Sequence, residues 1–149
     1  MTPTPPALAY RRAATQQASV VGLVIALYDT LAGDLQRAKA AMAQNNIEER
    51  SQQLQHGFTV LTQLDTLIDT ERGGQTAVNL RRFYGHVRGE MLRAQFTQDS
   101  SVLKHVSLLL LDVRSAWQEV DTRGSTQTTT SVTTEAQSTE VRNSLNCLA

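Results

Sequence analysis

The sequence contains a single cysteine, Cys147, so no disulfide can form within the chain. A lone cysteine is typical of proteins that work in a reducing cytosol. An excess of charge of either sign is also missing, because 14 basic residues balance 14 acidic ones. A balanced chain has no general electrostatic attraction for nucleic acid or for an anionic membrane. These absences favour a cytoplasmic protein that binds no nucleic acid.

Long hydrophobic runs are absent as well. The four consecutive leucines at Leu108–Leu111 are far fewer than the roughly 20 apolar residues that a membrane span needs. The N-terminus, M-T-P-T-P-P-A-L-A-Y-R-R, has no basic segment followed by an apolar one, so it does not resemble a secretory signal. We therefore expect no membrane insertion.

Proline is confined to the first six residues, and composition divides the chain into three zones. Residues 1–17 are Pro-led and then polar, and they are predicted to form a flexible N-terminal arm. Residues 18–121 hold almost every large apolar residue and are predicted to form a helical bundle domain. Residues 122–149 are mostly Ser, Thr and Gln, with too little apolar surface to offset the entropy of ordering, so they predict a disordered tail.

The middle zone shows the three- and four-residue apolar spacing that is typical of amphipathic helices. Asn46 followed by Glu49 predicts a capping box at the start of the second helix, and Asp99 or Ser100 is the predicted cap of the fourth. Between the second and third helices, Gly73 or Gly74 is expected to adopt a left-handed conformation, and Thr76 to cap the third helix. Four helices joined by short turns favour antiparallel neighbours. The predicted fold is all-α, an antiparallel four-helix bundle with room for a short extra N-terminal helix.

Residues that could support catalysis or hold a metal are few. His56, His86 and His105 fall on three different predicted helices and could meet, but no helix carries the His and Glu spacing that is usual for metals in bundles. Solvated or partly buried histidines are the simpler interpretation. Cys147 has no base nearby in its tail and is not a credible nucleophile. We expect no enzymatic activity, no metal and no cofactor.

Acidic side chains cluster near the end of the second helix, at Asp65, Asp69 and Glu71. Like charges one turn apart destabilise an isolated helix slightly, so a functional carboxylate pair is one interpretation. The simpler one is a solvated face paired with arginines of the third helix, which carries four arginines but only one glutamate.

Surplus apolar surface is the most informative feature. A bundle helix needs about three apolar positions per heptad, and the last three helices have more. Either the core is thick, or the extra residues form a groove for an amphipathic partner helix. Gly85 and Gly89 lie one turn apart on the third helix, where they would let another backbone approach closely. The extra residues are Val60, Leu67, Phe83, Leu92, Phe96, Leu108, Leu109 and Leu111.

Three stretches carry a resemblance to a known family. L-V-I-A-L-Y-D at 23–29 resembles the first-helix motif of the FliS family, flagellin chaperones of bacterial flagellar export. L-D-T-L-I-D-T-E-R-G-G-Q-T-A-V-N-L-R-R-F-Y at 64–84 resembles the central signature of that family. The stretches at 92–99 and 102–117 resemble the end of its third helix and its last helix.

The resemblance implies a cytoplasmic export chaperone that binds the C-terminal segment of flagellin, prevents premature polymerisation and presents it to the flagellar export apparatus. It also implies that Tyr10 covers the client surface in the free protein, although Tyr10 could equally staple the first helix. The residues predicted to bind the partner are Tyr10, Val60, Leu67, Asn79, Leu80, Phe83, Tyr84, Val87, Leu108 and Leu111. Two alternatives stay open: a helical adaptor that binds a flagellar regulatory protein, and a metal-carrying bundle enzyme.

Overall fold

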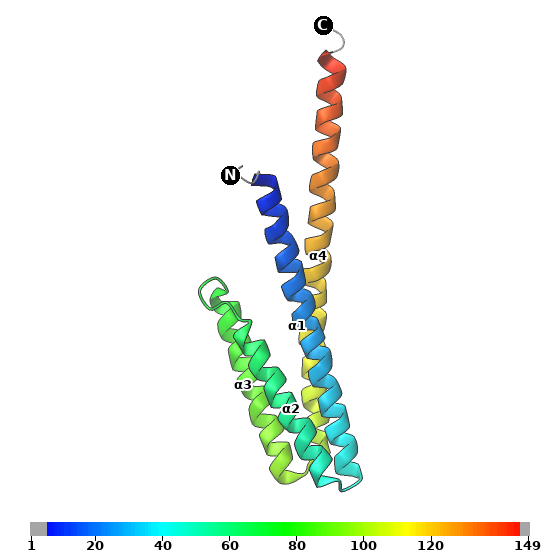
Figure 1. Cartoon of the computed structure of the whole chain (residues 1–149). Helices are drawn as coiled ribbons and strands as arrows, with labels where there is room; N and C mark the ends of the chain where they lie inside the picture. The colour runs from blue at the N-terminus through cyan, green and yellow to red at the C-terminus, as the bar shows by residue number, and fades with distance from the viewer. Residues whose placement is uncertain (1–5, 147–149) are drawn as a thin grey trace, which may run out of the picture. The chain divides into compact units, whose positions relative to one another are not determined.

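The computed structural model describes the backbone of residues 6–146 and, within it, the side chains of residues 7–8, 11–12 and 20–124. It contains four helices, which Figure 1 shows in chain order: α1 (Pro6–Ala43), α2 (Ile47–Thr66), α3 (Gly74–Thr97) and α4 (Ser100–Asn146). No strand occurs between residues 6 and 146. The four helices pack as a bundle, so the predicted all-α fold is confirmed.

The chain divides into two compact units. One unit is Leu23–Ala116, which contains α2, α3 and the adjoining parts of α1 and α4. The other is formed by the two ends of the chain, Met1–Gly22 and Trp117–Ala149. Within the residues that the structure describes, no helix is both long enough and apolar enough to cross a membrane.

The core lies in the Leu23–Ala116 unit, where all four helices contribute one apolar face. Three- and four-residue spacing places these side chains on a single stripe of each helix, and burying each large one contributes about 1.5–3 kcal/mol. Tyr28 of α1 is buried in this core. The largest fully buried apolar side chains are Tyr28, Leu31, Leu35, Leu54, Leu61, Leu64, Val87, Met91, Leu103, Val106 and Leu110.

Two of the predicted helix caps are present. The Asn46 side chain accepts a hydrogen bond from the Glu49 amide at 3.1 Å, which is the first half of the predicted capping box. The Glu49 carboxylate instead accepts a hydrogen bond from Gln53. Before α4, Asp99 Oδ1 accepts hydrogen bonds from the Ser101 amide and hydroxyl, at 2.9 and 2.6 Å. These bonds lower the pKa of Asp99.

The turn between α2 and α3 needs its two glycines for different reasons. Gly74 has a φ of +53°, in the left-handed region that glycine adopts without strain. Gly73 has an ordinary φ of −76°, but a Cβ there would lie 2.6 Å from the Asp69 carbonyl oxygen. The predicted Thr76 cap is wrong, because α3 already begins at Gly74 and places Thr76 inside its first turn.

Helical backbone continues into both ends of the chain, where the sequence predicted an arm and a tail. Most of residues 1–17 and 122–149 fall on the ends of α1 and α4. Adding a residue to an existing helix costs far less than nucleating a new one, so a helix can extend beyond its packed part. The bounds of the arm and the tail stay predictions.

Candidate binding surface

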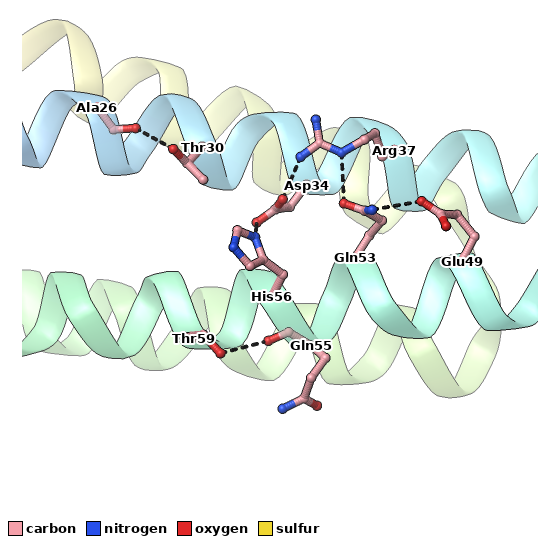
Figure 2. Close-up of polar contacts among 9 residues, drawn as sticks. All are labelled: Ala26, Thr30, Asp34, Arg37, Glu49, Gln53, Gln55, His56 and Thr59. Carbon is pink, nitrogen blue, oxygen red and sulfur yellow. Dashed lines mark hydrogen bonds and ion pairs between the residues drawn. The ribbon is translucent and has the colours of Figure 1, made fainter.

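One carboxylate is buried in the core of the Leu23–Ala116 unit. Asp34 on α1 is fully buried, and its Oδ1 accepts a hydrogen bond from Arg37 Nη2 at 2.7 Å. Its Oδ2 lies 2.7 Å from Nδ1 of His56 on α2, and Figure 2 shows both contacts. A buried charge is costly unless it is paired, and here both oxygens have partners. The cluster therefore ties α1 to α2.

Further side-chain hydrogen bonds continue this link between α1 and α2 in a row along the two helices. Arg37 Nε donates to Gln53 Oε1 at 2.8 Å, and Gln53 Nε2 donates to Glu49 Oε1 at 2.8 Å. Figure 2 shows the row from His56 to Glu49. Each group is engaged with a neighbour, so the row has the character of a structural link between helices.

Sequence reasoning missed this cluster, although a signal was available. Asp34 follows Leu31 by three residues and precedes Ala38 by four, which places it on the buried face of the helix. A carboxylate at such a position needs a partner, and His56 was the histidine that could supply one. The His56 side chain is itself partly exposed, as the simpler interpretation of the histidines held.

The acidic residues near the end of α2 serve electrostatics and turn structure. Asp65 Oδ1 lies 3.7 Å from Nε of Arg81 on α3, and the simpler interpretation expected this kind of ion pair. Asp69 Oδ1 accepts hydrogen bonds from the amides of Glu71 and Arg72, both at 3.1 Å. Within the described residues, no three His, Cys, Asp or Glu side chains are grouped so as to hold a metal ion.

Three of the predicted binding residues lie in the core. Val60, Tyr84 and Val87 are buried, and Tyr84 lies against Tyr28 with the two hydroxyl oxygens 3.0 Å apart. Burial, followed by the neighbouring Tyr28, raises the pKa of Tyr84 well above its usual range. These three side chains stabilise the free protein and present little surface to a partner.

The other predicted residues are more accessible. Leu67, Leu80 and Phe83 are half-buried near the turn between α2 and α3. Asn79 is exposed and accepts a hydrogen bond from Gln75. On α4, Leu108 is 55% exposed and Leu111 is 48% exposed, one turn apart on the same side. The backbone at Tyr10 is helical, but its side chain and Cys147 lie outside the described residues.

A second apolar face lies on α3 and includes Leu92 and Phe96, which the sequence marked as surplus apolar residues but which were not among the residues predicted to bind the partner. Val78, Leu92 and Phe96 are exposed large apolar side chains, and Phe96 is 83% exposed. Together with Gly85 and Gly89 they are spaced by seven, four, three and four residues, which places all five on one side of the helix. We call this set the outer stripe of α3. Its helical spacing was visible in the sequence, but spacing alone did not show that it faces outward.

Comparisons with known proteins agree on one family. The profile described as "Flagellar protein FliS" matches residues 4–124 of this chain. The chain is 34% identical over 86 residues to the flagellar secretion chaperone FliSB of Pseudomonas aeruginosa, covering 58% of this chain and 68% of the relative. It is 26% identical over 115 residues to the flagellar secretion chaperone FliS of Salmonella typhimurium, covering 76% and 85%. It is 28% identical over 93 residues to the flagellar secretion chaperone FliS of Vibrio cholerae, covering 60% and 68%.

Proposed function

Because the chain belongs to the FliS family of flagellar secretion chaperones, we propose that it binds the C-terminal segment of flagellin in the cytoplasm. Binding is the activity of such a chaperone, which is not an enzyme. The bound segment is then unavailable for polymerisation until the flagellar export apparatus receives it. The expected mechanism is competition between the chaperone and other copies of flagellin for the same apolar segment.

The observation that supports this proposal is apolar surface that the fold leaves uncovered. On α4, Leu108 and Leu111 are about half exposed, one turn apart on the same side of the helix. Exposed apolar residues that gather on one face are typical of interaction surfaces. A client that folds as it binds must offset its own ordering entropy, so it benefits from a long apolar track more than from one pocket.

The test is a calorimetric titration of the chaperone with flagellin and with flagellin that lacks its C-terminal segment. Full-length flagellin should bind, and the truncated protein should show no measurable binding. Equal binding of the two would contradict the proposal and favour a helical adaptor for another flagellar protein.

A paired variant identifies the surface. Leu108→Ser with Leu111→Ser should weaken binding at least about tenfold, since exposed anchors at an interface are each worth about 1 kcal/mol or more. The matched control is Ile47→Ser, which removes an equally exposed apolar side chain at the start of α2. Unchanged binding by the α4 variant would exclude this face of α4 from the client surface.

A further inference from the structure

Four glycines inside the helices or at the α2–α3 turn of the Leu23–Ala116 unit fall into two pairs. A Cβ at Gly57 would lie 2.8 Å from Met91 Cε, and a Cβ at Gly73 would clash with the Asp69 carbonyl. A side chain would therefore crowd a neighbour at both positions, and at Gly73 that neighbour is backbone. A Cβ at Gly85 or Gly89 would meet no atom within 4 Å. Each of these two costs about 1 kcal/mol of helix stability relative to alanine, and the fold gains no contact in return.

Exposed apolar side chains lie on the same side of α3 as these glycines. From Val78 to Phe96 the outer stripe covers 18 helical steps, or about 27 Å at about 1.5 Å per residue. Large side chains stand at its two ends and glycines at its middle. This shape suits a helix laid along α3, whose backbone comes closest over Gly85 and Gly89.

Positive charge borders the outer stripe on both edges. Arg81 and Arg88 lie on the edge beside α2, where Arg81 is 3.7 Å from Asp65 and Arg88 is close to Thr62 and the Phe58 ring. Arg82 and Arg93 lie on the opposite edge.

The charges on these edges are not balanced within α3. Glu90 is the one acidic residue of the helix, and it pairs with Arg93 at 2.8 Å. Within the described residues Arg82 has no hydrogen-bond or ion-pair partner. A partner with acidic side chains beside its apolar face would complement this surface.

We propose that the outer stripe of α3 docks one helix of the flagellin C-terminal segment, with its small residues over Gly85 and Gly89 and acidic residues beside Arg82. This inference rests on the proposed function for the identity of the partner. It adds a surface, a binding geometry and a charge preference that the exposed leucines of α4 do not supply.

The test is a titration of the flagellin C-terminal fragment against the full-length chain and three variants. Gly85→Leu with Gly89→Leu fills the middle of the stripe and should weaken binding at least about tenfold. Gly22→Leu is the matched control, because a Cβ at Gly22 also meets no atom within 4 Å. Arg82→Glu should weaken binding about three- to tenfold at low salt and less at high salt.

Each outcome separates the inference from the proposed function. If the unaltered chain does not bind the fragment, both are overturned. If it binds and the glycine variant and Arg82→Glu bind equally well, the inference alone is overturned. Circular dichroism should show all variants folded, since a Cβ at Gly22, Gly85 or Gly89 meets no atom within 4 Å and Arg82 is exposed. Should the double glycine variant misfold, Phe96→Ser tests the same stripe at a side chain that is 83% exposed, and unchanged binding by it would contradict the inference.

Discussion

The two faces of α3 are similar in composition and opposite in environment. On the inner face, Tyr84, Val87 and Met91 are buried against the other helices of the Leu23–Ala116 unit. On the outer face, Leu92 and Phe96 are just as apolar and lie exposed to water. Folding explains the inner face, because burial stabilises the bundle. The outer face exposes apolar area without contributing to the core, so its sequence reflects a requirement other than folding.

The glycines show the same contrast between positions that folding explains and positions that it does not explain. Gly73 stands where a backbone oxygen excludes a side chain, so the fold itself requires it, and a Cβ at Gly57 would crowd the Met91 and Leu31 side chains. Gly85 and Gly89 stand where a side chain would meet only solvent. A residue that destabilises its own helix and relieves no clash is best explained by something that is absent from the free protein.

The largest expected effect comes from replacing one residue on each face of α3 with alanine, at two neighbouring positions. Met91→Ala should lower the free energy of unfolding by about 2–5 kcal/mol, because it leaves a cavity among buried side chains. Leu92→Ala, one position further, should change it by no more than about 0.5 kcal/mol, since that side chain is exposed. Urea unfolding followed by circular dichroism measures both.

Flagellin binding should show the reverse order. Leu92→Ala should weaken binding, whereas Met91→Ala should change it little under conditions where the variant stays folded. A large loss of stability in Leu92→Ala would mean that the outer face is packed, and the contrast between the two faces of α3 would be lost.

A smaller effect, of opposite sign at two sites, is expected for glycine-to-alanine changes. Gly73→Ala should destabilise the protein by about 1–3 kcal/mol, because its Cβ would lie 2.6 Å from a backbone oxygen that cannot move freely. Gly85→Ala should stabilise it by about 0.8–1 kcal/mol through helix propensity alone. Thermal unfolding of both variants beside the unaltered protein measures the two signs, and destabilisation by Gly85→Ala would show that the fold does require that glycine.

Local patterns allowed most of the fold to be predicted. Apolar spacing located the four helices, and the caps were narrowed to Asn46 and to Asp99 or Ser100 because capping is decided by a few adjacent residues. The orientation of each helix face was harder to predict. Apolar residues lie on both the inner and the outer face of α3, and spacing alone does not say which stripe meets the core.

The same difficulty explains why the binding residues were predicted less well than the helices. Val60, Tyr84 and Val87 were predicted to bind a partner and lie in the core, whereas Phe96 was noted only as a surplus apolar residue, Val78 was not noted, and both are exposed. Asp34 and His56 are 22 residues apart, so their contact depends on how α1 and α2 pack. The sequence identifies which residues are apolar or charged, but tertiary packing decides which of them remain accessible.

The smallest expected effect concerns Asp99, at the exposed start of α4 beside the end of the outer stripe. Hydrogen bonds from Ser101 lower its pKa from the ordinary value of 3.8. A carboxyl whose pKa is lowered by folding stabilises the protein above its unfolded-state pKa, and that stabilisation is lost as the pH falls through the folded-state pKa. Asp99→Asn keeps a cap but does not titrate, so its unfolding temperature should approach that of the unaltered protein as the pH falls from about 6 to below about 4.

The control for this prediction is the same substitution in a Ser101→Ala background. Ser101→Ala removes the hydroxyl that donates to Asp99 Oδ1, which is the largest cause of the lowered pKa. In that background, the difference in unfolding temperature caused by Asp99→Asn should depend much less on pH. A difference that stays constant down to acidic pH in the unaltered background would show that Asp99 stabilises the start of α4 through hydrogen-bond geometry and not through charge.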